Sequence, residues 1–425
     1  MAPFPMSRGV QNEQETKASA TRALARLAAG EKAPLARWLR THLFEHILPF
    51  WEQQAFDPHG GICTCVGVKG EVLSHDKWMW SQWRAVWVYA RLYNRIDREE
   101  RWLNHARHIA EFCLRHAWDS AGDGWALVVS REGKILRGNE SIYSDSFAIY
   151  GLLELYLATG DDELRRVACW TADAALRKLS RPYDTIPHVP YPIPPGTKPH
   201  GIPMIWSLTL AELGKALNRE DYLRAAAAFA DEIFRDFYRR DRDVILEFVR
   251  QDGREYDPPQ GLAINPGHAI EDMWFQVHVA LILGNGAARI AEAFRLTLRH
   301  LDLGWDGSHG GGLRLAVDAN QSETVGWGFA ETKLWWPHTE ALYTTLLGWC
   351  QTGRREFFDW YERIWQLCLA HYVDWENGEW RQRLRRDFTP LSEFVAFPVK
   401  DPFHLPRSLI LQIELLENRG LVQRP

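Results

Sequence analysis

The sequence lacks several features that would place it in a common class of protein. Its 425 residues contain no run of about 18 uncharged apolar residues, so we expect no membrane span and no secretory signal. The formal net charge is -5, and the excess of cations found in nucleic-acid-binding proteins is missing. We therefore expect no membrane and no nucleic acid as partners, and a cytoplasmic location.

Cysteine and short cofactor motifs are also sparse. The six cysteines are scattered along the chain, which favours reduced thiols over a disulfide framework. Cys63 and Cys65 lie two residues apart, but no second pair follows, so we expect no zinc site there. Neither a glycine-rich phosphate loop with lysine nor a GxSxG turn is present. The sequence thus predicts no metal and no cofactor.

Tryptophan, in contrast, is abundant, with 21 residues. Hydrophobic residues make up 46% and charged residues 25% of the chain, as in ordinary globular proteins. We expect most tryptophans to pack in a helical core and a minority to line a sugar-binding site, where flat rings stack on C–H surfaces.

Apolar helical segments recur along the chain at a spacing of about sixty to seventy residues. Each has apolar residues on more than one face, which is typical of a buried helix. These segments are residues 77–93, 144–159, 202–217, 268–283, 335–350 and 404–416.

Amphipathic segments lie between them and predict half-exposed outer helices. They are residues 35–51, 99–116, 162–179, 221–238, 287–301 and 356–371. Six such pairs predict an all-α fold, an (α/α)6 barrel, with an open helical solenoid as the alternative. Short β-hairpins are expected in the loops, at 122–133, 244–253 and 310–318. We expect one catalytic barrel domain over residues 31–425, preceded by a loose leader or short outer helix over 1–30. The proline-rich stretch 182–203 is typical of a lid or binding loop.

Two histidines stand at predicted helix starts. His268 follows an Asn-Pro-Gly turn, and Glu271, three residues later, can orient the imidazole, bind a substrate hydroxyl or cap the helix. His404 precedes Pro406, which marks a first helical turn, and Arg407 follows. Both histidines would lie at the same end of inner helices and could face one cavity.

Other ionisable residues lie within apolar helical segments. Arg84 stands between Trp80 and Trp87, and a buried arginine must be paired or functional. Glu340 follows Trp336 by four residues, and it is equally well explained as the structural partner of an arginine.

Taken together, these motifs resemble the N-acylglucosamine 2-epimerase family of the renin-binding-protein type. The resemblance extends from about residue 50 to residue 417. It rests on Lys77, Trp80, Gln82 and Arg84, on Ser141–Asp145, on Asn265–His268 with Glu271 and Trp274, on Lys333–Ala341, and on Phe403, His404, Pro406 and Arg407.

This resemblance implies an (α/α)6 barrel that, without a cofactor, inverts C2 of an open-chain amino sugar, interconverting N-acyl-D-glucosamine and N-acyl-D-mannosamine. It implies His268 and His404 as the acid–base pair and Arg84 near the sugar carbonyl. Glu271, Glu340, Trp336 and Arg407 are the further expected substrate-binding residues. A homodimer is a possible assembly.

Three alternatives remain open. An aldose–ketose isomerase would use one histidine to move a proton from C2 to C1. A glycoside hydrolase would need a carboxylate pair, for which Glu271 with Glu340 or Asp145 are the candidates. A binding protein without activity is the third. Trp83, Leu262 and Ala263 depart from the pattern of the family, and residues 201–205 lack a histidine found in related branches, so the sugar itself stays open.

Overall fold

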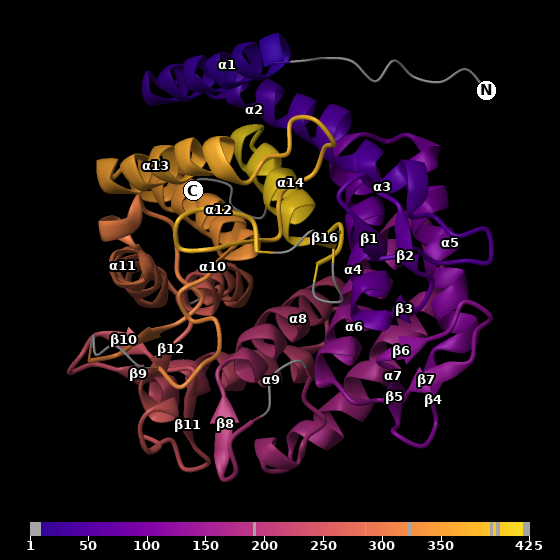
Figure 1. The fold of residues 1–425 in the computed structure, drawn as a ribbon. Coiled ribbons are helices and arrows are strands. Elements are labelled where there is room, and N and C mark those ends of the chain that lie inside the picture. Colours follow the sequence, from indigo (N-terminus) through magenta and orange to yellow (C-terminus); the bar gives the residue numbers. More distant parts are fainter. Residues whose placement is uncertain are drawn as a thin grey trace.

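Six inner helices form a closed ring in the computed structural model, which describes residues 10–189, 193–284, 286–320, 325–391, 394–396 and 400–419 (Figure 1). They are α4 (Met79–Arg91), α6 (Ile142–Thr159), α8 (Gly201–Leu217), α10 (Pro266–Leu283), α12 (Trp335–Thr352) and α14 (His404–Leu416). The ring closes between its first and last members, where Arg91 of α4 binds Glu414 of α14 at 2.6 Å. The (α/α)6 barrel is therefore confirmed, and the open solenoid is not formed.

An outer layer of helices surrounds the ring. It consists of α2 (Lys32–Thr41), α3 (Leu48–Gln54), α5 (Glu100–His116), α7 (Asp162–Leu179), α9 (Glu220–Glu232), α11 (Ala287–Gly304) and α13 (Arg355–His371), with a π-helical turn, η1 (His42–Ile47), between α2 and α3. In α5, for example, Trp102, Ala106, Ile109 and Cys113 are buried at spacings of three and four residues, so one face packs inward. In α12 nearly every residue is buried, as expected of an inner helix.

Short strands fix the starts of several inner helices. Among them are β3 (Lys77–Trp78), β8 (Thr197–Pro199), β12 (Ala263–Ile264) and β14 (Lys333–Leu334), which precede α4, α8, α10 and α12. Their partners are β6 (Val128–Val129), β11 (Phe248–Arg250), β13 (Val317–Asp318) and β15 (Arg383–Leu384). Each inner helix of this group thus begins at a hydrogen-bonded anchor.

The three predicted hairpins contain strands, but their pairing differs from a simple local hairpin. In 244–253, β10 (Val244–Ile245) pairs with β9 (Tyr238–Arg239), while β11 pairs with β8. In 122–133, β5 (Gly124–Trp125) pairs with β4 (Trp118–Asp119), and β6 pairs with β3 and with β7 (Ile135–Arg137). In 310–318, β13 pairs with β12.

A further sheet joins β1 (Cys65–Gly67) to β2 (Val72–Ser74) and β16 (Phe394–Ala396).

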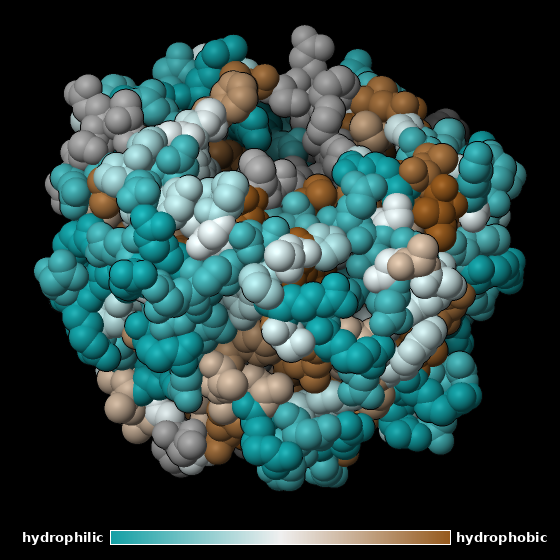
Figure 2. Space-filling view, turned by 90° about the horizontal axis from the view of Figure 1, so that it is seen from below, coloured by the Kyte–Doolittle hydropathy of each residue, from teal (hydrophilic) through white to brown (hydrophobic). Residues whose placement is uncertain are grey.

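Helix α1 (Val10–Ala28) lies outside the ring against α2 (Figure 1). Residues 1–9 of the predicted leader lie outside the described residues, and the division of the chain at residue 30 stays a prediction. The face shown in Figure 2 is mostly hydrophilic, with hydrophobic residues in small separate patches. In the described parts of the chain, no helix has the length and apolar character needed to cross a bilayer.

Tryptophan fills the core, as its abundance suggested. Ten of the twelve largest fully buried side chains are tryptophans, among them Trp83, Trp206 and Trp335 on inner helices. Because these indole rings are fully buried, most of them are structural.

Candidate active site

His268 lies in the first turn of α10. The side chain of Asn265 caps this helix and accepts a hydrogen bond from the His268 amide at 3.2 Å. The imidazole Nδ1 lies 3.0 and 3.1 Å from the two carboxylate oxygens of Glu247. A ring that donates through Nδ1 keeps a lone pair on Nε2, which is then free for proton transfer.

Glu247 was not predicted from the sequence. It lies between β10 and β11, where its amide donates to Ala263 O at 2.8 Å and its carbonyl accepts from the amide of His200 at 2.9 Å. Its side chain is buried. Glu271, for which the sequence left open an orienting, substrate-binding or capping role, has its carboxylate bound to Arg407. The only signal for Glu247 was a single acidic residue within an apolar, strand-like stretch.

His404 is the first residue of α14. Its Nδ1 lies 2.8 Å from Glu340 Oε1, so a carboxylate orients this ring as well. The other carboxylate oxygen of Glu340 accepts a hydrogen bond from Trp274 Nε1 at 2.9 Å. Arg407, one turn further along α14, donates through Nη2 to Glu340 Oε1 at 2.7 Å and also to Glu271. Four inner-helix side chains therefore hold His404 in place.

The ionic group formed by Arg407, Glu271 and Glu340 is buried. The exposed fractions of these residues are 1%, 5% and 1%. Because these three residues are buried, they are better placed to hold His404 than to contact a ligand. Their role in binding substrate stays a prediction.

Trp336 brings the two histidines into one site. The centroid of its indole lies 5.3 Å from the ring centroid of His268 and 5.6 Å from that of His404. The side chains of His268 and His404 are 16% and 10% exposed. Among the described residues neither Nε2 has a hydrogen-bond partner. Both imidazoles thus present a free nitrogen beside the same aromatic ring.

Arg84 of α4 lies close to this group. Its Nη1 donates to Asp401 Oδ2 at 3.2 Å, and its guanidinium lies 3.9 Å from the centroid of the Phe147 ring. Asp401, which sequence reasoning missed, is buried three residues before His404. The arginine keeps 13% of its side chain exposed, so the side chain is not fully closed off from solvent.

The two histidines differ in basicity. Burial lowers the pKa of His268, but the Glu247 carboxylate more than offsets this effect, and the pKa lies above its ordinary value. Burial lowers the pKa of His404 well below its ordinary value, and the cations of Arg84 and Arg407 act in the same direction. At neutral pH the site therefore holds a neutral His404 and a more readily protonated His268.

The two histidines and Trp336 lie at the end of the ring where the inner helices begin. His268, Trp336 and His404 fall in the first turns of α10, α12 and α14. Helix N-termini carry partial positive charge, which stabilises an anion by about 0.3–1 kcal/mol per helix. The arrangement can thus remove a proton from a bound molecule, return one, and stabilise the anion formed in between.

Other candidates from the sequence have structural roles. His338, in the Trp-Trp-Pro-His motif, is buried; its Nδ1 contacts Leu334 O at 2.7 Å, and its Nε2 accepts from the amide of Leu313 at 2.8 Å. Asp145 is buried and binds Lys178 at 2.5 Å. Because Glu271 and Glu340 bind the same arginine nitrogen, the geometry does not favour the two flanking carboxylates of a glycoside hydrolase.

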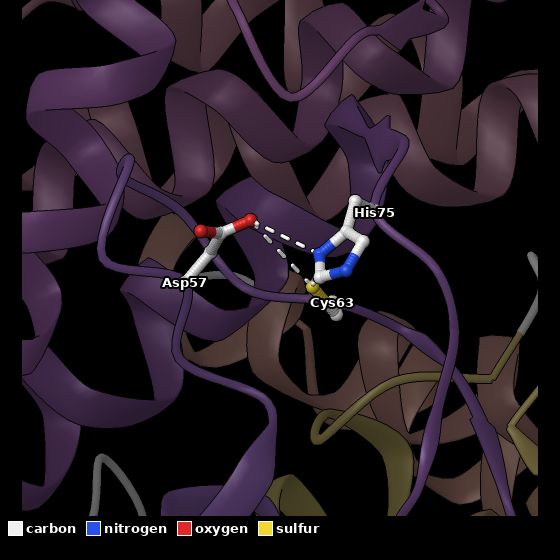
Figure 3. Close-up of side chains that lie close together, drawn as sticks. All are labelled: Asp57, Cys63 and His75. Atoms are coloured by element: carbon white, nitrogen blue, oxygen red, sulfur yellow. Dashed lines mark hydrogen bonds and ion pairs between the residues drawn. The ribbon is translucent and has the colours of Figure 1, made fainter.

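Two clusters contain side chains of the types that bind metal ions. In each cluster, however, a lysine or an arginine already occupies the position of a cation. The first comprises Asp57, Cys63 and His75 (Figure 3), where Lys77 Nζ lies 2.9 Å from Asp57 and 3.3 Å from the Cys63 sulfur. The second comprises Glu271, Glu340 and His404, where the guanidinium of Arg407 is inserted.

The geometry can now be compared with known proteins. The family model for N-acylglucosamine 2-epimerase matches residues 61–405. N-acylglucosamine 2-epimerase from Bos taurus is 30% identical over 383 residues, covering 88% of this chain and 89% of the relative. The enzyme of that name from Mus musculus is 30% identical, covering 89% and 91%.

The chain belongs to the N-acylglucosamine 2-epimerase family. It is a sugar epimerase and thus an isomerase. Cellobiose 2-epimerase from Ruminococcus albus is a more distant relative, 25% identical over 400 residues and covering 86% of this chain and 95% of that protein.

Solved structures share the fold of this family member. Cellobiose 2-epimerase from Bacillus thermoamylovorans superposes with a TM-score of 0.77 at 18% identity, covering 89% of this chain and 98% of that one. A D-mannose isomerase superposes with a TM-score of 0.75 at 17% identity, covering 89% and 97%. At these identities the likeness supports the (α/α)6 architecture alone.

Proposed function

We propose that this epimerase interconverts N-acyl-D-glucosamine and N-acyl-D-mannosamine by moving a proton at C2 of the open-chain sugar. The observation that carries the proposal is the pair of histidines on one tryptophan, each with its own carboxylate partner and a free Nε2. Inversion needs a base on one face of the carbon and an acid on the other, and two imidazoles meet this need. The relatives at 30% identity support the choice of an N-acylated sugar.

In this scheme neutral His404 removes the C2 proton from one epimer, and protonated His268 delivers a proton to the opposite face. The unequal pKa values favour this starting state, because the carboxylate of Glu247 holds a proton on His268. A positioned acid or base typically contributes about 10²–10⁴-fold to the rate. The reverse direction exchanges the two roles.

The intermediate is an enolate whose charge develops on the aldehyde oxygen. The positive charge of Arg84, whose side chain is 13% exposed, and the N-termini of the inner helices supply positive potential for that oxygen. Trp336, in contact with both imidazoles, offers a ring face for the C–H surface of the sugar. Arg407, Glu271 and Glu340 act through His404 by fixing its ring.

A single experiment tests the reaction and its main rival. The enzyme is incubated in deuterated water with N-acetylglucosamine, N-acetylmannosamine, glucose or mannose, and the products are assigned by NMR. Formation of the second N-acetylated epimer with deuterium at C2 supports the proposal. A ketose product would show an aldose–ketose isomerase instead, and turnover of free hexoses alone would overturn the N-acylated substrate.

Single substitutions test the two-histidine mechanism. His268→Asn and His404→Asn should each abolish epimerisation. Each should still exchange the C2 hydrogen of the one epimer whose hydrogen faces the remaining imidazole. Full epimerisation by either variant would contradict the mechanism.

A further inference from the structure

The proline-rich stretch 182–203 meets the start of α6 through His188. The Nε2 of His188 lies 3.0 Å from the hydroxyl of Tyr143, the second residue of that helix, and the centroids of the two rings lie 5.2 Å apart. The hydroxyl of Ser141, one residue before the helix, donates to Val189 O at 3.0 Å. Two adjacent residues of the stretch are therefore docked on the start of α6.

The Tyr143 hydroxyl lies close to His268, at the end of the ring where the inner helices begin. A Cβ added to Gly201, the first residue of α8, would lie 2.7 Å from this hydroxyl and 4.0 Å from Cε1 of His268. Tyr143 is half-buried, so its side chain is not closed off from solvent. Because glycine has no side chain, a phenol hydroxyl and the imidazole of His268 can both approach the start of α8.

We propose that His188 is a positioning residue for the sugar and acts through Tyr143. Its imidazole holds the Tyr143 hydroxyl beside His268, and this hydroxyl binds an O–H or N–H group of the open-chain sugar. A phenol hydroxyl can form more than one hydrogen bond, and a group that is already held in place costs less ordering when the ligand binds. The inference rests on the proposed function, because it takes the sugar to lie between His268 and His404.

Loss of this contact should change KM more than kcat, because a hydrogen bond remote from C2 is made equally in the ground state and the transition state. Tyr143→Phe removes only the hydroxyl, and KM should rise about 3- to 10-fold, the range for one hydrogen bond, with kcat within about twofold of wild type. His188→Ala should raise KM by a similar factor. His188→Gln, whose side-chain amide can donate to the phenol oxygen, should restore most of the loss.

A double-mutant cycle distinguishes positioning through Tyr143 from a general effect on the loop. In the Tyr143→Phe background, His188→Ala should have no further effect on KM. Ser141→Ala is the matched control: it removes a bond between the loop and the same helix start, but not the bond to Tyr143, and it should keep the wild-type KM. Additive effects in the cycle, or a rise in KM in Ser141→Ala equal to that in His188→Ala, would overturn the proposal.

Gly201→Ala gives an independent check on the place of the hydroxyl. The new Cβ would lie 2.7 Å from the Tyr143 hydroxyl, which is too close, but 3.6 Å from the ring carbon Cζ, which is an ordinary contact. The substitution should therefore raise KM in the wild-type background and have a much smaller effect in the Tyr143→Phe background. An equal effect in both backgrounds would overturn the proposal.

The kinetics are followed by NMR with whichever sugar the wild-type enzyme converts, so the cycle does not depend on an N-acyl group. Calorimetry with the open-chain alcohol obtained by reducing that sugar repeats the comparison without turnover, and its Kd should rise by the same factor as KM. If the wild-type enzyme converts only free hexoses, the proposed substrate is wrong, whereas the cycle still tests His188. If it converts N-acetylated sugars and the cycle is additive, only the role of His188 is wrong.

Discussion

Replacing Glu247 by glutamine tests how the basicity of His268 is set. The carboxylate contacts His268 Nδ1 with both oxygens, at 3.0 and 3.1 Å, in a buried position. Hydrogen bonds to a charged group contribute about 1.5–3 kcal/mol. Because one pKa unit corresponds to about 1.4 kcal/mol, loss of the charge should lower the pKa of His268 by about 1–2 units.

The sign of the effect on the reaction follows from the proposed role of His268 as the acid. A lower pKa means that His268 loses its proton at lower pH, so the alkaline limb of the kcat/KM profile should move down by about 1–2 units. The acid limb, set by the already depressed pKa of His404, should stay in place. At neutral pH we expect kcat to fall about 10- to 100-fold, in proportion to the lost interaction.

The assay is the pH dependence of epimerisation, followed by NMR from about pH 5 to 10, a range chosen to follow the alkaline limb. Glu255→Gln is the matched control. Glu247 directly precedes β11, whereas Glu255 follows it, is 43% exposed and pairs with Arg239 and Arg242. It should leave the profile unchanged. If Glu247→Gln has a wild-type alkaline limb and wild-type kcat, Glu247 does not set the basicity of His268.

Three further predictions follow from the structure. In Gly267→Ala the new Cβ would lie 2.6 Å from the ring of Trp336, which contacts both histidines, so kcat/KM should fall more than about tenfold. Gly328→Ala is the control: Gly328 has open space around it, and this variant should retain activity in the same assay. Arg407→Met would leave two buried carboxylates unpaired and should destabilise the fold by about 3–5 kcal/mol in urea titrations; wild-type stability would show that Arg407 is not the partner they need. Several buried histidines have pKa values lowered to about 3 or 4 by burial. Because these histidines bind protons more readily in the unfolded chain, thermal stability should fall as the pH drops below about 6.5. A midpoint of thermal unfolding that stays constant between about pH 6.5 and 4.5 would refute this. These histidines are His42, His278, His300 and His338.

The barrel could be predicted because its evidence is local. Inner helices such as α12 are buried on all sides, and outer helices such as α5 on one side, so periodicity alone distinguishes the two layers. The starts of α10 and α14 were marked by Asn265-Pro266 and by Pro406, and this placed His268 and His404 at one end of the ring.

The partners of these side chains could not be predicted, since they come from distant parts of the chain. Glu247 lies 21 residues before His268, on a different element, and Asp401 lies 317 residues after Arg84. The same limit explains the hairpins: the stretch 244–253 has the composition of two strands, but β11 pairs with β8, about fifty residues upstream. Local pattern identifies an element, whereas its partner depends on the tertiary fold.

The difference between the two histidines likewise arises from the fold. The side chains of His268 and His404 are only 16% and 10% exposed, and both contact a carboxylate through Nδ1, so these contacts alone would give the two rings similar pKa values. The distinction lies in burial and the surrounding charge: burial lowers the pKa of His404 and the cations of Arg84 and Arg407 lower it further, whereas the carboxylate of Glu247 raises the pKa of His268 above its ordinary value. In the proposed mechanism the same type of side chain thus serves as acid and as base, because burial and two arginine cations lower the pKa of one of them.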